Sequence, residues 1–110
     1  MKRTRTLSNP ALLALAVLAD ARGQWRHGYD IGAQSGVKSG TLYPLLMRLE
    51  AAGQLEAQWE ASSIAGRPPR HVYRLTAAGT ALVASLADAM ATARASRLAA
   101  SMADVSGAGA

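Results

Sequence analysis

Hydrophobic residues recur with helical spacing in the middle of the chain, over residues 39–53. Four leucines are separated by three, one and three positions, which places them on one face of a helix: Leu42, Leu45, Leu46 and Leu49. Gly53 follows the last of these turns and can end the helix. The pattern therefore predicts an amphipathic helix that buries its leucine face and leaves the opposite face open to solvent.

After this helix the period changes to two, which is typical of strands. Residues 55–60 and 72–75 both alternate between side chains for the two faces of a sheet. The segment between them, the wing loop of residues 62–70, contains Gly66 and two prolines and has the composition of a turn. The pattern predicts a two-stranded hairpin. A helix that leads into a hairpin with a basic tip is typical of a winged helix.

A helix is also predicted upstream, from Asn9 to about Arg22. Asn9 is a residue type favoured at the N-cap, Pro10 suits the first helical position, and Gly23 can stop the helix. Apolar side chains surround most of this helix, so we expect it to be buried.

Basic residues precede that helix. Residues 1–8 include Lys2, Arg3 and Arg5, and we expect a basic arm that either contacts phosphate or is a solvated tail. The same residues before an apolar run resemble a secretory signal peptide. The Asn9-Pro10 start favours a structural helix instead, because cleavage would remove the helix that covers the leucine face. The run is also too short to span a bilayer, so we expect a cytoplasmic protein without a membrane partner.

A short second helix is expected over residues 28–35, after a turn that begins at Gln24. Tyr29 and Ile31 would face inward. Residues 36–38 would then form the turn of a helix-turn-helix, which leads directly into the leucine-bearing helix.

The last helix is expected over residues 77–104, with Thr76 as its N-cap. Its length would be about 40 Å at 1.5 Å per residue. Its apolar stripe consists of Leu82, Val83, Leu86 and Met90. A helix this long overhangs a small domain, so we expect it to pair with a second copy; packing within its own chain is the alternative. Residues 105–110 are expected to be disordered.

These elements predict a mainly α-helical fold with a small β-hairpin: a winged helix-turn-helix over residues 9–76, then a dimerisation helix. A chain of 110 residues suits one small domain. It contains no phenylalanine, so the core is expected to consist of leucine with a few larger fillers: Trp25, Trp59, Tyr29 and Tyr73. Such a small core would be stabilised by an interface with a second copy of the chain.

The charge balance favours a nucleic-acid partner. The formal net charge is +5, and arginine supplies ten of the 12 basic residues. Arginine forks onto phosphate or guanine better than lysine does, although a solvated basic surface would have the same composition. The absence of cysteine excludes disulfides and thiolate metal sites, and it fits a reducing cytoplasm.

Several short motifs, in this order, resemble PadR-type transcriptional regulators: His27–Asp30, Ser39–Leu46, Arg48–Glu50, Gly53, Trp59, Gly66–Pro68 and Tyr73–Thr76. The resemblance covers roughly residues 10–90, and the short C-terminal part is similar to the subclass with a single C-terminal helix. It implies a dimeric winged-helix repressor. In that family the helix that begins at Ser39 would enter the DNA, the hairpin would be the wing, and the terminal helix would pair the subunits.

The expected DNA contacts lie at the leucine-bearing helix and on the wing loop: Lys38, Ser39, Thr41, Tyr43, Arg48, Arg67 and Arg70. Ser39 is the expected N-cap, and the backbone N–H groups of residues 40–42 would be free for a phosphate. Tyr43 would reach the DNA backbone or a base edge; packing under the wing is the alternative. The wing arginines would reach a phosphate or the minor groove, with a solvated hairpin tip as the alternative.

We therefore expect a homodimeric repressor that binds a pseudo-palindromic operator, with half-sites about one helical turn, roughly 34–36 Å, apart. The alternative is a winged-helix module that binds a protein. A salt dependence near −0.9 per contacted phosphate would identify DNA binding. The sequence has no pattern for catalysis, cofactor binding or a metal site, so we expect that the protein is not an enzyme. His27 and His71 are expected to be structural residues.

A small aromatic effector is a further expectation, by analogy with PadR-like proteins that respond to such ligands. Trp25, Tyr29 and Met90 would line its pocket at the dimer seam. Ordinary core packing of the same three residues is the alternative.

Overall fold

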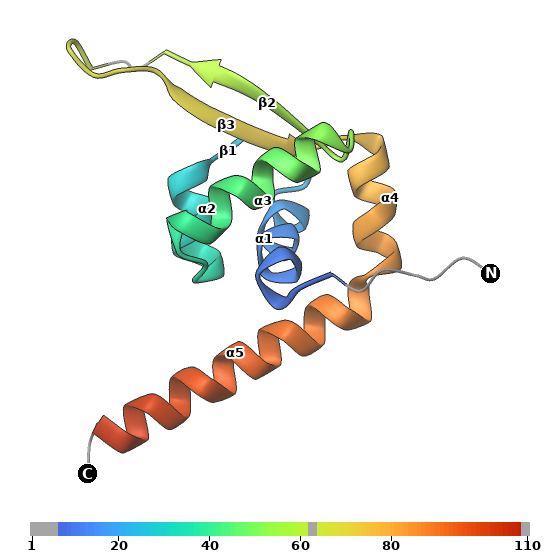
Figure 1. Ribbon diagram of the computed structural model, residues 1–110, viewed down its shortest axis with the longest axis vertical. Coiled ribbons are helices and arrows are strands. Elements are labelled where there is room, and N and C mark those ends of the chain that lie inside the picture. The colour runs from blue at the N-terminus through green and yellow to red at the C-terminus, as the bar shows by residue number, and fades with distance from the viewer. Residues whose placement is uncertain (1–6, 62–63, 109–110) are drawn as a thin grey trace.

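The structure is a computed structural model that describes residues 7–61 and 64–108 (Figure 1). Its elements follow the order α1 (Asn9–Asp20), β1 (Arg26–His27), α2 (Gly28–Ser35), α3 (Ser39–Ala51), β2 (Leu55–Glu60), β3 (Arg70–Leu75), α4 (Ala77–Ser85) and α5 (Ala87–Ala108). The predicted fold class, mainly helical with a small hairpin after a helix-turn-helix, is confirmed. None of the described helices is long and apolar enough to cross a membrane.

Helix α1 lies at the centre of the molecule, with α2, α3, α4 and α5 packed around it (Figure 1). Its buried residues lie on every side of the helix, as expected from its sequence. The N-cap is Ser8 and not Asn9: the Ser8 hydroxyl accepts a hydrogen bond from the Ala11 N–H at 3.3 Å. Leu7 packs against the core, so residues 7 and 8 belong to the domain. The rest of the expected arm, residues 1–6, lies outside the described part of the chain.

The helix-turn-helix is formed by α2 and α3. Gly36 ends α2 with a left-handed φ of 77°, and its N–H donates to the Gly32 carbonyl at 2.9 Å. Ile31 is fully buried, as predicted, but Tyr29 is 76% exposed, so its predicted inward orientation is wrong. Side chains two positions apart on a helix point in directions that differ by about 200° around its axis, so Tyr29 and Ile31 cannot share a face.

Helix α3 buries the predicted leucine face, since all four leucines are at most 7% exposed: Leu42, Leu45, Leu46 and Leu49. The N-cap is Lys38 rather than Ser39, which is the first helical residue. Pro44 lies inside α3. Because the leucines fix which side of α3 faces the core, its polar residues must face away from α1.

The sheet contains three antiparallel strands in the order β1-β3-β2. In the predicted hairpin, Leu55 pairs with Leu75 and Glu60 with Arg70. Strand β1 corrects the expected turn at residues 24–28, since Arg26 and His27 pair with Tyr73 and Val72. A two-residue strand has no detectable alternation, so only its pairing with β3 defines it.

The large aromatic residues contribute less to the core than expected. Tyr73 is buried, but Trp59, near the end of β2, is 65% exposed. The hairpin projects beyond the helices towards its tip (Figure 1). Trp25 is half-buried, and the Arg74 guanidinium lies 4.5 Å from its ring centroid. Tyr29 is exposed. The core therefore rests on leucine, with isoleucine, valine and Tyr73 as its other larger members.

The expected last helix is two helices, which meet at a sharp angle (Figure 1). Leu86, with φ −108° and ψ 12°, separates α4 from α5. This bend turns α5 back across α1, where Ala93 is buried and the Arg94 guanidinium pairs with the Asp20 carboxylate at 2.6 Å. The expectation of disorder from residue 105 is also wrong as far as residue 108, because α5 continues to Ala108.

Thr76 caps α4 as predicted and also ties it to the end of α3. Its hydroxyl accepts from the Gly79 N–H at 3.1 Å and donates to the Gly53 carbonyl at 2.6 Å. The Thr76 N–H donates to the Gln54 carbonyl at 3.1 Å. Gly79 packs directly on that carbonyl group, with no room for a Cβ.

The predicted apolar stripe packs mainly within its own chain. Val83 belongs to the buried core, and Leu82, Leu86 and Met90 are half-buried against it. Further along α5, Leu98 and Met102 are 61% and 64% exposed. They lie four positions apart and therefore share one face of α5.

Candidate nucleic-acid interface

The start of α3 presents polar residues to solvent. Lys38, Ser39 and Thr41 are exposed, and so is Arg48 two turns further along. Not all of the expected backbone donors are free, because the Thr41 and Leu42 N–H groups both donate to the Lys38 carbonyl, at 3.0 and 2.8 Å. A phosphate at this helix end would therefore meet the first N–H groups of α3 and the side chains of Lys38, Ser39 and Thr41.

Tyr43 occupies a position between α3 and the wing. It is 40% exposed, and its ring packs against Gly28 at the start of α2. The ring is therefore partly held by α2, while much of it stays open to a partner. The exposed ring also lines a groove, which is described below.

The wing loop carries two exposed arginines, Arg67 and Arg70. The loop turns at Gly66, which has a left-handed φ of 86°, and the Arg67 N–H donates to the Ile64 carbonyl at 3.2 Å. Residues 62 and 63 of the predicted wing lie outside the described residues. Arg70 begins β3 opposite Glu60.

The basic side chains at this face have no acidic partners among the described residues. No ion pair involves Lys38, Arg48, Arg67 or Arg70 there, whereas two arginines elsewhere are paired: Arg74 with Glu56 at 3.0 Å, and Arg94 with Asp20 at 2.6 Å. Free cations along one face suit a polyanion, because no existing ion pair has to be broken.

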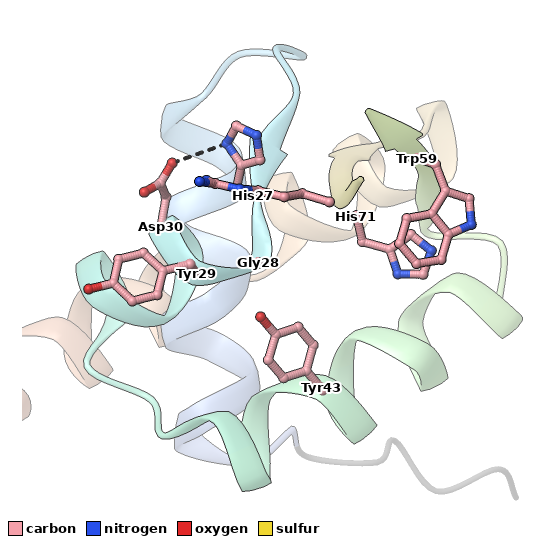
Figure 2. Close-up of a pocket in the computed structure, with 8 residues that line it drawn as sticks. His27, Gly28, Tyr29, Asp30, Tyr43, Trp59 and His71 are labelled. Atoms are coloured by element: carbon pink, nitrogen blue, oxygen red, sulfur yellow. Dashed lines mark ion pairs between the residues drawn. The ribbon is translucent and has the colours of Figure 1, made fainter. Parts of the chain in front are cut away.

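A groove lies between the wing and the α2–α3 pair, and the sequence did not indicate it. It has a volume of about 660 Å³ and is lined by His27, Gly28, Tyr29, Asp30, Tyr43, Trp59, Arg70 and His71 (Figure 2). Trp59 and His71 are stacked with ring centroids 3.8 Å apart, and the Tyr73 ring meets His71 edge-on at 5.7 Å. Trp59 and His71 are cross-strand partners, so the strand alternation was the signal that could have placed them together.

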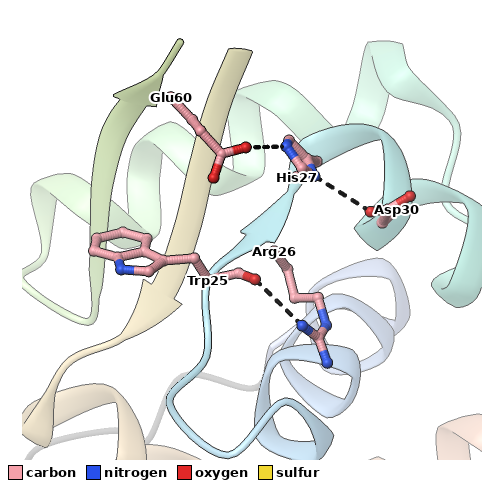
Figure 3. A network of polar contacts seen from close by, with 5 residues as sticks. All are labelled: Trp25, Arg26, His27, Asp30 and Glu60. Carbon is pink, nitrogen blue, oxygen red and sulfur yellow. Dashed lines mark hydrogen bonds and ion pairs between the residues drawn. The ribbon is translucent and has the colours of Figure 1, made fainter. Parts of the chain in front are cut away.

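His27 connects the root of the wing to α2. Its Nε2 lies 2.7 Å from Glu60 Oε1, and its Nδ1 lies 3.5 Å from Asp30 Oδ2 (Figure 3). His27 is therefore hydrogen-bonded, as predicted. Glu60 is 33 positions away along the chain, so only the tertiary structure could identify it as the partner.

Trp25, Tyr29 and Met90, predicted to line an effector pocket, are not brought together within the chain. Trp25 lies under Arg74 beside the sheet, and Tyr29 lines the groove under the wing. Met90 lines a separate hollow of about 380 Å³ between α1 and α5.

The buried tyrosine of β3, Tyr73, has a phenol whose pKa is shifted. Burial raises the pKa of Tyr73 above its ordinary value near 10, and the negative charges of ionised Tyr43 and of Glu50 act in the same direction. Tyr73 therefore stays neutral at physiological pH and contributes shape rather than charge beneath the groove.

Comparison with known proteins agrees with this geometry. The family model for the transcriptional regulator PadR-like family matches residues 15–85. The chain belongs to the PadR-like family of transcriptional regulators. The match covers the second half of α1, the helix-turn-helix, the wing and α4, so this PadR-like chain is a DNA-binding transcriptional regulator. No curated protein matches it in sequence.

Solved structures with the same fold include other members of the family. A PadR family transcriptional regulator from Eggerthella lenta is 27% identical, with a TM-score of 0.58 over 88% of this chain and 83% of its own. A PadR family regulator from Clostridium difficile is 21% identical, with a TM-score of 0.63 over 79% and 92%. BpsR from Bordetella bronchiseptica, whose DNA binding is regulated by 6-hydroxynicotinic acid, is 19% identical, with a TM-score of 0.63 over 82% and 64%. Below 25% identity, the likeness shows the fold alone.

Proposed function

We propose that this PadR-like regulator is a cytoplasmic repressor that binds a pseudo-palindromic operator as a homodimer. The observation that carries the proposal is that two solvent-exposed elements with basic side chains unpaired among the described residues, α3 and the wing, meet at one groove, which Tyr43 and Arg70 line. The wing then extends beyond the helices (Figure 1). In this arrangement α3 enters the major groove while the wing reaches the flanking backbone.

The proposed contacts divide into two kinds. Lys38, Ser39 and Thr41 bind the phosphate at the start of α3, and Arg48, Arg67 and Arg70 bind phosphates on either side. Tyr43 is the side chain placed to reach a base edge, since it lies on the exposed side of α3 and within the groove. Free cations in both elements support this division.

The proposed dimer uses the C-terminal helices. Leu82, Leu86 and Met90 keep part of their surface exposed, and Val83 supports them from the core. Leu98 and Met102 extend the apolar surface along α5, and a large exposed apolar patch usually marks an interface. Pairing along α5 would cover them and place two copies of α3 on one side of a duplex, as a two-fold operator requires.

A small aromatic effector that relieves repression is part of the proposal. It is supported by BpsR, a fold neighbour whose DNA binding is regulated by 6-hydroxynicotinic acid, and by the aromatic groove at the DNA-facing side of this chain.

Selection of duplexes from a random pool by the purified protein tests the function directly. A two-fold symmetric consensus is expected, bound with an affinity that falls with salt by a slope of about −0.9 for each phosphate contacted. Repression follows if that sequence overlaps a promoter and reporter expression rises when the gene is deleted. A protein that enriches no sequence and shows no salt dependence would contradict DNA binding.

A further inference from the structure

The direction of α5 relative to the rest of the domain depends on contacts along its length. Helix α5 begins after the bend at Leu86, and its C-terminal part projects away from the other helices (Figure 1). Closer to the bend it packs on α1, where Ala93 is buried and the Arg94 guanidinium pairs with the Asp20 carboxylate at 2.6 Å. A long helix joined at one end can swing about that end unless contacts further along hold it.

Arg97 lies on the side of α5 that faces the domain. It follows Met90 by seven positions and Ala93 by four, a spacing that keeps all three on one face of a helix. Met90 and Ala93 pack on their own chain. The Arg97 guanidinium lies against Gly36, at the turn of the helix-turn-helix: a Cβ at Gly36 would stand 2.5 Å from Nη2 and 2.7 Å from Cζ of Arg97. Arg97 thus joins α5 to a second element of the domain.

The end of α2 suits a guanidinium for two reasons. The last carbonyl groups of a helix have no donor within that helix and carry partial negative charge, so a nearby arginine is favourable there. Gly36, which ends α2 with a left-handed φ of 77°, has no side chain, so the planar group can approach the backbone directly. Because Arg97 is exposed, the contact adds little to stability, and its main effect is on geometry.

The contact connects the two functional parts of the chain. Gly36 is two positions before Lys38, which caps α3, and Arg97 directly precedes Leu98, which is exposed on α5. Arg97 also lies eleven positions after Leu86, or about 16 Å along the helix. A contact that far from the bend restrains the angle of α5 more strongly than an equal contact beside the bend.

We infer that Arg97 is a positioning residue: its contact with Gly36 fixes the direction of α5 relative to the helix-turn-helix. In a dimer paired along α5, this direction sets the distance and the rotation between the two α3 helices, and so the operator spacing that the protein accepts. The second half rests on the proposed function; the restraint on α5 within one chain does not. A residue outside the proposed DNA contacts then contributes to operator specificity.

Operators of altered spacing measure this effect. One added base pair moves a half-site by about 3.4 Å and rotates it by about 34–36°. The unmodified protein should bind its selected operator roughly tenfold more tightly than versions with one base pair added or removed at the centre. Arg97→Ala should reduce this ratio to about threefold or less, because α5 can then adjust its direction. Its affinity for a duplex with a single half-site and its mass in sedimentation should stay unchanged.

Further variants separate the contact from a general effect of charge. Arg97→Lys keeps the charge but loses the planar fork, so it should restore only part of the ratio. Gly36→Ala should lower the ratio from the other side of the contact, because its Cβ displaces the guanidinium. The double variant should lose no more than the larger single loss, since both changes remove one contact. Ser96→Ala is the matched control beside Arg97 and should keep the full ratio.

The restraint within one chain can be measured without DNA. The sequence has no cysteine, so Met47→Cys on α3 and Ala103→Cys on α5 introduce the only two thiols, both at exposed positions. Spin labels on these thiols, with the labelled chain diluted in unlabelled protein, give the α3–α5 distance within a subunit by pulsed electron paramagnetic resonance. Arg97→Ala should broaden this distance distribution, whereas Ser96→Ala should not.

Each outcome decides the inference. A lower spacing ratio in Arg97→Ala at unchanged half-site affinity, together with a broader α3–α5 distance, supports it. An unchanged ratio, an equal loss of affinity for a single half-site, or an unchanged distance distribution would overturn it. If the unmodified protein is a monomer or selects no two-fold operator, the proposed function fails, while the spin-label distances still decide whether Arg97 holds α5.

Discussion

The ring of Tyr43 lies against the backbone of Gly28, so that the first residue of α2 shapes the exposed side of α3. A Cβ at Gly28 would stand 2.7 Å from Tyr43 Cε1 and 2.8 Å from its hydroxyl oxygen. Those atoms are the far end of a side chain that can rotate away, whereas the backbone there is helical and accepts alanine. Gly28 is therefore a means of changing the Tyr43 position without changing Tyr43.

We expect Gly28→Ala to displace the Tyr43 ring and to weaken operator binding by roughly three- to tenfold, or about 1 kcal/mol. The thermal midpoint should hold or rise, because alanine stabilises a helical position by up to about 1 kcal/mol relative to glycine. Fluorescence anisotropy with labelled operator and a melting curve measure the two effects. Unchanged DNA affinity would mean that the orientation of the Tyr43 ring does not matter for binding.

The wing arginines are tested by their salt dependence. Arg67→Ala should weaken DNA binding and reduce the log–log salt slope by about one, because one phosphate contact is lost. Since Arg67 is exposed, the melting temperature should change little. Arg74→Ala is the matched control, because Arg74 is paired with Glu56 on the hairpin. A slope that stays the same in Arg67→Ala would remove this residue from the contact set.

The contact between α4 and the α3–β2 turn has no space for a side chain at Gly79. Gly79→Ala forces a Cβ into the Gln54 carbonyl group, and backbone atoms cannot rotate away as a side chain can. We expect a loss of about 1–3 kcal/mol in the free energy of unfolding, measured with urea. Gly40→Ala is the control: its Cβ would meet nothing within 4 Å, so stability should stay or increase. Equal stabilities for the two variants would mean that α4 shifts freely.

The apolar residues of the C-terminal helices are of two kinds: those expected to contact a second copy, and those that pack on their own chain. Leu98→Asp should weaken pairing, seen as a loss of mass in sedimentation at micromolar concentration, because it places a carboxylate in an apolar contact. Ser96→Asp adds the same charge on the other side of α5 and should leave the mass unchanged. Leu86→Asp should instead unfold the chain, since Leu86 packs on its own core. A monomeric unmodified protein would contradict the dimer altogether.

Tyr73 gives the protein a stability limit at alkaline pH. Its pKa is raised by burial, then by the Tyr43 and Glu50 charges, so the folded state keeps the phenolic proton that the unfolded chain loses near pH 10. Stability is therefore complete below about pH 10 and falls as pH rises above it. Urea unfolding at successive pH values should show this fall, and Tyr73→Phe should reduce it. A fall of the same size in the variant would assign it to other groups.

Local pattern predicted the parts of this protein that depend on neighbours in the chain. The spacing of Leu42, Leu45, Leu46 and Leu49 determined which side of α3 is buried, and so which side is free for DNA. Alternation along residues 55–60 and 72–75 determined the hairpin, and the Thr76 hydroxyl capped α4 as its residue type implied. Helix periodicity, strand alternation and capping act over a few residues, so the sequence contains them directly.

The tertiary structure decided what those faces meet. Strand β1 exists because β3 pairs with it, and the bend at Leu86 lets α5 pack on α1 instead of running past the domain. A hydrogen bond joins His27 to Glu60 across 33 positions, and the groove brings Tyr29 and Trp59 to one hollow. An apolar stripe or an aromatic residue has the same sequence pattern whichever surface packs against it. Which surface covers it is set by contacts between distant segments, and those contacts form only when the whole chain packs.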